Sequence, residues 1–428
     1  MSGQVLDRMT SLAHKGTAGH QNEPSVGVVE MHRVPQITVH AFCDTPEMLT
    51  TMENLAADRR MVRTHAKVHR GGIAAAVAMY VEASSPNLVI VESTADPGGL
   101  RAQLDALADV CATGTKLIVV GYANDVALYR DLLGRGVSEY LVGPVNAVAM
   151  IAVIAQLYQN TAENKLGQSF AFIAATGGAG SSTVAHNVAS TLGRTYGCDV
   201  ILADFDLAFG SASLGFNLNT TQGMAQALQN DSRLDYALLE SLLTKSEPHL
   251  SVLTAPATLE QPYDLLETTF EHIVEIAQAN VPYLVLDLPH VWNAWTKRVL
   301  RLADQVVITA TPDLVSLRNA KNLVEQLKDV RLNDTAPRIV LNQTGVPKRV
   351  EIKADKFAEA LGLQPIASIP FEPATFSAAA NKGSMIADIS ARSTATRCFG
   401  KIAQAVSGRD AVGKKPRSRF PFARLWKR

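Results

Sequence analysis

The sequence predicts an α/β protein with two doubly wound parallel sheets, one after the other along the chain. Strand-like and helix-like segments alternate through most of its 428 residues, and the central strands are apolar on both faces. Alternation of this kind is typical of parallel sheets covered by helices on both sides. A glycine-rich loop between a strand and a helix opens the second unit. A chain of this length is expected to hold two or three domains.

The first domain is predicted over residues 35–160. Residues 1–34 before it are polar and lack sustained periodicity, so we expect a disordered leader there. Strands are predicted at 37–44, 87–94, 116–124 and 138–144. Helices are predicted at 46–58, 74–83, 100–112, 126–136 and 147–159. This order is that of one doubly wound sheet.

The second domain is predicted over residues 166–407, roughly 240 residues, which is large but acceptable for one domain. Helices separate its strands, which are predicted at 169–175, 199–206, 250–255, 283–289, 305–311 and 338–343. A tail follows at 408–428. Its segment 413–428 combines basic and aromatic residues and contains no acid.

Composition excludes several classes of protein. Forty basic residues balance forty acidic ones, so the whole chain is not a general nucleic-acid binder on charge grounds. The four cysteines lack metal-ligand spacing, and we expect thiols in a reducing compartment; they are Cys43, Cys111, Cys198 and Cys398. No apolar run reaches the roughly 18 residues of a spanning helix, and the first residues lack a signal-peptide core. We therefore expect a cytoplasmic protein whose membrane contact, if any, is peripheral.

The glycine-rich loop TGGAGSST (176–183) predicts a phosphate-binding site. Its glycines let the backbone turn tightly, so that several N–H groups can point inward at an anion. The helix that starts beyond the loop adds a positive dipole end. The spacing of Gly177, Gly178, Gly180 and Ser182 fits a phosphate loop of the P-loop class better than a GxGxxG dinucleotide loop. A glycine-rich turn without a ligand is the alternative.

On these residues the sequence resembles a family. TGGAGSST is similar to the KGGxGK[ST] loop of the MinD/ParA class of deviant-Walker ATPases. Over about residues 36–407 the chain resembles more closely the CpaE/TadZ proteins, which are MinD-like proteins of the Flp (tight adherence) pilus machinery. They carry a receiver-like domain ahead of an ATPase-like domain. The resemblance therefore implies a receiver-like sheet followed by a MinD-like P-loop sheet.

Both lysines of the family's loop are replaced, by Thr176 and Ser181. In the family the second lysine neutralises the β and γ phosphates, and the first reaches across a nucleotide-sandwiched dimer. Phosphoryl transfer depends mainly on positioned cationic groups, so we expect ATP binding with very slow hydrolysis or none. Loss of the first lysine also argues against the usual sandwich dimer, although a homodimer stays open.

The rest of the implied site is present. By resemblance ATP and Mg²⁺ are the cofactors, and Asp206 is the catalytic acid that positions water. Nucleotide contacts are expected from Gly177, Gly178, Ala179, Gly180, Ser181, Ser182, Thr183 and Asn342. Metal contacts are expected from Ser182, Asp204 and Asp287. Since strand side chains alternate, Asp204 and Asp206 should point the same way from a strand end.

The first domain lacks the phosphorylation residues of a receiver. Asp44 stands alone where an acid pair is needed, Glu92 is at or near the acceptor position, and Gly143 replaces the lysine before Pro144. We therefore expect a pseudo-receiver used for protein contacts or polar targeting.

The sequence leaves open what the basic tail binds and what role a group of four cations has. Basic residues are attracted to anionic membranes and aromatic residues prefer the interface, so the tail would bind a membrane, an anionic partner or only solvent. Lys297, Arg298, Arg301 and Arg318 flank the strand at 305–311 and would replace the lost lysines or form a solvated face.

The leading hypothesis is a cytoplasmic organiser of Flp pilus assembly at the cell pole or inner membrane. It would bind ATP through the second domain and recruit pilus proteins through the first. An active ATPase with a replacement cation is the second hypothesis. A ParA-type DNA-partitioning protein is the third, and nucleic acid is the less favoured partner because the evident basic run is the tail.

Overall fold

The computed structural model describes most of the chain as two compact units. The described residues are 34, 37–62, 64–158, 167–220, 222–256, 259, 265–331 and 333–409. The N-terminal unit holds the described residues up to 158 together with 330–334, and the C-terminal unit holds the others. Nearly all of the predicted leader and tail lies outside the described residues. None of the described helices is both long enough and apolar enough to cross a membrane.

The N-terminal unit contains a five-stranded parallel sheet in the order β2-β1-β3-β4-β5. The strands are β1 (Thr38–Cys43), β2 (His65–Arg70), β3 (Leu88–Glu92), β4 (Lys116–Gly121) and β5 (Glu139–Val142). The helices are α2 (Pro46–Ala56), α3 (Gly72–Glu82), α4 (Pro97–Ala108), α5 (Val126–Gly134) and α6 (Ala147–Tyr158), with a short turn η1 (Arg59–Met61). The strand order reverses at β1 and β3, which is the doubly wound pattern. The predicted fold class is confirmed.

Side-chain alternation in the sheet decides which helices cover each face. Leu88 and Ile90 of β3 pack in the cluster that contains side chains of α2 and α6. Val89 and Val91 pack on the other face with α3, α4 and α5. Because successive strand residues point to opposite faces, a run that is apolar throughout is buried between two helix layers.

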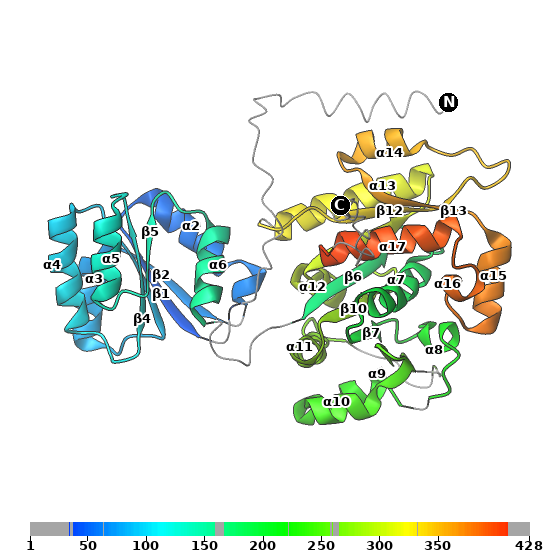
Figure 1. The fold of residues 1–428 in the computed structure, drawn as a ribbon, viewed down its shortest axis with the longest axis horizontal. Helices are drawn as coiled ribbons and strands as arrows, with labels where there is room; N and C mark the ends of the chain where they lie inside the picture. Colours follow the sequence, from blue (N-terminus) through cyan, green and yellow to red (C-terminus); the bar gives the residue numbers. More distant parts are fainter. Residues whose placement is uncertain are drawn as a thin grey trace, which may run out of the picture. The chain divides into compact units, whose positions relative to one another are not determined.

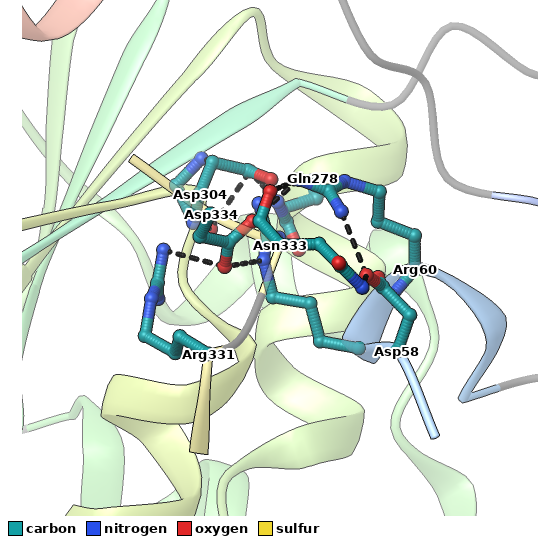
Figure 2. Close-up of polar contacts among 9 residues, drawn as sticks. Asp58, Arg60, Gln278, Asp304, Arg331, Asn333 and Asp334 are labelled. Atoms are coloured by element: carbon teal, nitrogen blue, oxygen red, sulfur yellow. Dashed lines mark hydrogen bonds and ion pairs between the residues drawn. The ribbon is translucent and has the colours of Figure 1, made fainter. Parts of the chain in front are cut away.

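A cluster of buried ion pairs connects the η1 turn of this unit with Arg331 and Asp334 (Figure 2). Asp334 pairs with Arg59 at 2.6 Å and also with Arg60, whose guanidinium in turn lies 2.9 Å from Asp58. Arg331 contacts Asp334 at 2.9 Å. All these side chains are at most 8% exposed. Buried charges are tolerated only when they are paired in this way, so the cluster attaches residues 330–334 to the N-terminal unit.

Glu92 at the end of β3 accepts hydrogen bonds from several donors instead of facing solvent. The backbone N–H groups of Asp44 and Thr45 donate to its carboxylate at 2.7 and 2.8 Å, and the Thr45 hydroxyl donates at 2.8 Å. The Tyr122 hydroxyl donates at 2.6 Å. A side chain at Gly143 would collide with the Tyr122 ring, 2.8 Å from its Cβ. The Tyr122 side chain therefore fills the space beside Gly143 and reaches Glu92.

Replacing Glu92 by glutamine is expected to lower the free energy of unfolding of the N-terminal unit by about 1–3 kcal/mol, because a fully buried carboxylate with charge-assisted hydrogen bonds loses acceptors. Far-UV circular dichroism in urea measures the change. Tryptophan fluorescence provides an internal reference, since Trp292 and Trp295 belong to the C-terminal unit and the described residues of the N-terminal unit include no tryptophan. The exposed Glu82 at the end of α3, changed to glutamine, is the matched control. Equal stability of E92Q and E82Q would refute the structural role of Glu92.

The C-terminal unit contains an eight-stranded sheet in the order β13-β12-β11-β6-β10-β7-β9-β8. All neighbours are parallel except β8 with β9. The strands are β6 (Gln168–Ala174), β7 (Val200–Asp204), β8 (Thr244–Glu247), β9 (Leu250–Leu253), β10 (Tyr283–Asp287), β11 (Gln305–Ala310), β12 (Arg338–Thr344) and β13 (Pro365–Pro370). Because β6 lies among parallel neighbours, the loop after it opens at the carboxyl edge of the sheet, where ligands of open α/β folds bind.

Helices cover both faces of this sheet. On one face α7 (Ser181–Tyr196) and α17 (Thr394–Ser407) lie side by side, as Figure 1 shows, and share one apolar cluster with β6, β7 and β10. The remaining elements are α8 (Ala212–Gly215), α9 (Met224–Gln229), η2 (Asp231–Arg233), α10 (Tyr236–Leu242), α11 (Glu271–Asn280), α12 (Ala294–Leu302), α13 (Leu314–Val330), α14 (Ala354–Leu361), α15 (Pro373–Lys382) and α16 (Ile386–Ile389). Asp304 fixes the start of β6 by accepting from Ser169 N at 2.8 Å and from Gln278 at 3.1 Å (Figure 2).

The structure adds three strands that the sequence pattern did not predict, namely β2, β8 and β13, the last of which reads PIASIP. β2 reads HAKVHR and lies at a sheet edge, with no residue of the strand fully buried. β8 reads TKSE and lies at an edge of the eight-stranded sheet, where it pairs with β9 in the antiparallel direction. All three are edge strands and lack the unbroken apolar run that identifies a central strand, because an edge strand needs a partner on only one side.

Candidate nucleotide site

The predicted phosphate loop joins β6 to α7 and turns through left-handed glycines. Gly178 has φ +79° and Gly180, the residue before α7, has φ +87°. Conformations of this kind favour glycine. A Cβ at Gly180 would lie 2.5 Å from the side-chain nitrogen of Asn342, whereas Gly177 and Gly178 face open space. The loop therefore leaves room for an anion in front of the first N–H groups of α7.

Side chains from neighbouring strands hold this loop in place. Asn342 of β12 donates to the carbonyl oxygen of Ala179 at 2.8 Å, and Gln343 donates to that of Gly178 at 3.0 Å. Asn319 of α13 donates to the carbonyl oxygen of Ala175 at 2.9 Å. These bonds use carbonyl groups of the loop, whereas among its N–H groups that of Ala179 donates within the loop, to the carbonyl oxygen of Thr176 at 3.1 Å. In the described structure the Asn342 amide thus supports the loop, which is a role additional to the predicted contact with the nucleotide.

Short hydroxyl side chains occupy both positions of the missing lysines. Thr176 Oγ1 lies 3.1 Å from the hydroxyl of Ser316 in α13. Ser181 is 6% exposed, and its hydroxyl has no hydrogen-bond partner among the described residues. Ser182 and Thr183, in the first turn of α7, are partly exposed. Neither replaced position therefore brings positive charge to the loop.

A cleft of about 310 Å³ lies beside the loop. Gly178, Gly180, Thr183, Asn342 and Phe371 are among the residues that line it, together with Pro370 and Pro373. Phe371 is 39% exposed and offers an aromatic face. The combination of an amide, an aromatic ring and a phosphate-type loop suits a purine nucleotide, since small-molecule sites are mostly apolar with a few placed polar groups. No lysine or arginine is among the lining residues that the structure describes.

The structure brings Asp204 and Asp287 together and places Asp206 in the loop after β7. Asp204 and Asp287 are register partners at the ends of β7 and β10. β7 ends at Asp204, two residues before the predicted end, so the expectation that Asp206 continues the same strand is wrong. Asp206 lies in the following loop, where its carboxylate accepts from Phe209 N at 2.9 Å. The loop begins there because Asp204 itself accepts from the N–H groups of Asp206 and Ala212, at 3.1 and 3.0 Å.

Burial perturbs the acid at the end of β7. Asp204 is fully buried, and its pKa is raised to about 7 by burial first and then by the charge of Asp287. The two backbone N–H groups that donate to it act in the opposite direction. Perturbed carboxyl groups of this kind cluster at functional sites, which supports the predicted role of this sheet edge.

The sequence reasoning missed His186. This residue lies on α7, four positions after Ser182 and on the same helix face, and it is 4% exposed. Its Nε2 atom is 3.2 Å from Oδ2 of Asp287. The Phe216 ring packs at 5.5 Å from its ring centre. The available signal was the pair of polar residues, His186 and Asn187, in the stretch VAHNVA, with His186 at a helical spacing that points back toward the loop.

The cations for which a replacement role and a solvated face were both left open lie in different surroundings. Arg298 of α12 pairs with Glu271, and Lys297 is exposed on the same helix. Arg318 of α13 is exposed and donates to Asn319 Oδ1 at 3.1 and 3.2 Å. Asn319 also donates to the carbonyl oxygen of Ala175, at the start of the loop. Arg318 is therefore connected to the loop through the side chain of Asn319.

Comparison with known proteins finds relatives of the part of the chain that contains the loop. The family described as "AAA domain" matches residues 167–340. A septum site-determining protein MinD homolog from the chloroplast of Arabidopsis thaliana is 28% identical over 163 residues, 36% of this chain and 48% of that protein. This chain spans about half the length of the curated relatives it matches.

Two solved structures extend the comparison. A ParA family ATPase from Chlorobium tepidum TLS is 25% identical with a TM-score of 0.51, and the match covers 56% of this chain and 98% of that one. A pilus assembly protein CpaE from Caulobacter crescentus CB15 is 47% identical over 30% of this chain and 97% of that one, with a TM-score of 0.29. The 47% identity over almost the whole of the CpaE chain decides the family of this protein.

The chain belongs to the CpaE branch of the MinD/ParA class. The resemblance that the sequence motifs indicated is therefore confirmed. The AAA-domain match begins at the first residues of β6 and ends in β12, so it includes the loop, Asp204, Asp206 and Asp287. The phosphate loop and the three acids of this CpaE-branch protein thus lie within the matched residues, whereas Asn342 and Phe371 of the cleft lie beyond them.

Proposed function

We propose that this protein is an ATP-binding organiser of pilus assembly that hydrolyses ATP very slowly or not at all. One observation carries the proposal: the loop has the backbone of a phosphate site and lacks its cations. Gly178 and Gly180 hold the left-handed turn, while the lysine positions contain Thr176 and Ser181. Binding depends on the backbone N–H groups, whereas turnover depends on charge that develops in the transition state.

The residues fit ATP and Mg²⁺. The cleft of about 310 Å³ adjoins the loop and contains Asn342 and Phe371 beside the expected adenine position. The hydroxyl of Ser182 and the carboxylate of Asp287 would hold the ion, with Asp204 behind them. When bound, Mg²⁺ would neutralise phosphate charge, and this chain's own contribution is to fix the phosphates with backbone N–H groups.

If hydrolysis is slow, bound ATP would act by stabilising one state of the protein and not as a substrate. A ligand that binds only the folded or dimeric state stabilises that state in proportion to its concentration relative to the dissociation constant. The exposed apolar side chains Phe209, Leu214 and Trp292 follow β7 and β10 near the nucleotide site. Such a surface supports association with a partner or a second copy of the chain when nucleotide is bound.

The pilus context rests on the CpaE relationship. We propose that the partners are proteins of the Flp pilus machinery and that the N-terminal unit recruits them as a pseudo-receiver. Its acceptor position contains Glu92, held by Tyr122 and the β1–α2 turn, which supports a fixed state in place of phosphorylation. Location at the cell pole or the inner membrane, with the basic tail as a peripheral contact, is part of the same proposal.

The central test is direct nucleotide binding by the full chain. Calorimetry and equilibrium dialysis are expected to detect ATP binding, stronger with Mg²⁺ than with a chelator, because the ion offsets phosphate repulsion that no lysine offsets. The dissociation constant should be below about 1 mM, which corresponds to about −4.1 kcal/mol. No uptake at millimolar ATP, in a chain whose circular dichroism indicates correct folding, would refute the proposal.

An active ATPase is the second candidate, and Arg318 is the observation that favours it. This cation is exposed, and its partner Asn319 contacts the loop. An arginine that enters from a neighbouring element can stabilise transferred phosphate as an arginine finger does. This candidate differs from the first because it requires sustained turnover by the unmodified chain.

A further inference from the structure

The cluster of His186, Asp204 and Asp287 is buried beneath the nucleotide site and comes from three elements. His186 lies on α7, Asp204 ends β7 and Asp287 ends β10. One ligand atom from each residue lies within 4.8 Å of the others, and all three residues are buried. Adjacent parallel strands bring the two acids together, and α7 crosses over them from the loop.

Unsatisfied atoms point into this cluster. In the described part of the chain, neither Nε2 of His186 nor Oδ1 of Asp287 has a hydrogen-bond partner. Nε2 and Oδ2 of Asp287 are 3.2 Å apart, yet their geometry is not that of a hydrogen bond. Buried polar atoms without partners are costly and rare in native proteins, so a group that satisfies them is expected.

We propose that these three residues form a site for a divalent transition ion of the Zn²⁺ class. Ligands of one tetrahedral zinc ion lie about 3.3 Å apart, given bonds of about 2.0–2.1 Å. The separation of 3.2 Å between His186 and Asp287 already matches this spacing. The ligand atom of Asp204 lies within 4.8 Å of the other two ligand atoms. It therefore has to move by less than the length of one zinc–ligand bond to complete a set of three ligands.

The donor set selects the class of ion. Imidazole nitrogen together with carboxylate oxygen favours Zn²⁺ and its neighbours, whereas Mg²⁺ favours oxygen ligands alone. The proposal therefore goes beyond the magnesium assignment of the same carboxylates. It predicts an ion that binds without nucleotide, deeper than the ion that accompanies ATP.

The surroundings support a metal centre in two ways. Both oxygens of Asp204 accept backbone hydrogen bonds, from Asp206 and Ala212, and such bonds orient metal-binding carboxylates. His186 also borders a cleft of about 510 Å³ between α7, α8 and α15, so one of the three proposed ligands lies beside a space through which an ion would enter. A side chain at Gly215 would approach the other ring nitrogen to 3.1 Å, so the glycine keeps this side of the ring accessible.

The test uses the full chain, stripped of metal, kept reduced and without nucleotide. Zn²⁺ is titrated in competition with a chromophoric chelator, and Co²⁺ is bound in parallel because its visible absorption reports the coordination. We expect one strong site per chain. His186→Gln should weaken Zn²⁺ binding by at least about 10–100-fold, since even second-shell changes have effects of this size, and should remove the cobalt absorption. His249→Gln is the control, because His249 forms an exposed pair with Asp199 at 3.1 Å.

The proposal is overturned if no strong Zn²⁺ site exists, if H186Q binds Zn²⁺ as the wild-type chain does, or if Mg²⁺ competes as effectively as Zn²⁺. Asp287→Asn gives a second variant should H186Q fail to fold by circular dichroism. Because the titration omits nucleotide, its failure leaves ATP binding intact, and failure of ATP binding leaves the metal result intact.

Discussion

Replacing Ser181 by lysine is expected to raise the ATP turnover of this chain by about 100–1,000-fold, because a positioned cation would return to the loop. A lost electrostatic donor costs about 2.7–4 kcal/mol in a transition state, and its restoration should recover most of this. Ser181 is the first residue of α7, directly after the left-handed Gly180, so the lysine would start where the family's own lysine starts. Phosphate release by the full chain, at saturating ATP and Mg²⁺, is the measurement.

Two further variants make this result interpretable. Ser241→Lys adds the same charge at an exposed position on α10 and should leave turnover at the wild-type level. Adding Asp206→Ala to S181K should return the rate to background, because the resemblance makes Asp206 the acid that positions water.

Comparable turnover in the wild-type chain and in S181K would contradict the proposed function. In that case a replacement cation is already present, and Arg318 is the candidate to remove next. If Arg318→Ala then abolished turnover, the active-ATPase alternative would be the better description of the protein.

Changing Gly180 to alanine is expected to weaken ATP binding by about 10–100-fold. The residue has φ +87°, and a Cβ there would lie 2.5 Å from the Asn342 amide. The loop would have to move, and one hydrogen bond from a backbone N–H group to phosphate would be lost, at about 1.5–3 kcal/mol. Each 1.4 kcal/mol is a factor of ten in affinity. Calorimetry with ATP and Mg²⁺ measures the change.

Gly197 provides a matched control for this substitution. It ends the same helix with φ +59°, and a Cβ there would meet nothing within 4 Å. G197A should therefore carry a similar cost in backbone strain, roughly 1 kcal/mol in stability, with unchanged affinity for ATP. Equal affinities of G180A and G197A would mean that the loop does not grip the phosphates.

The order of elements and the loop could be predicted from the sequence because they depend on local patterns. The apolar strand before Thr176, the glycines and the hydroxyl residues are consecutive, so their geometry follows from neighbouring residues alone. The same is true of the central strands, such as β3, where every residue is buried. The edge strand β2 was missed because its partly exposed HAKVHR pattern has no apolar run.

The sequence by itself therefore determined two parallel sheets, a phosphate-type loop and the absence of both loop lysines. Only the tertiary structure decided that Asp206 leaves the strand, that Tyr122 fills the space beside Gly143, and that His186 meets Asp204 and Asp287. The reason is physical: a motif is a set of residues close along the chain, whereas a buried polar cluster joins residues that strand pairing brings together. The energy of such a cluster depends on how many of its polar atoms find partners, and that number exists only once the chain is folded.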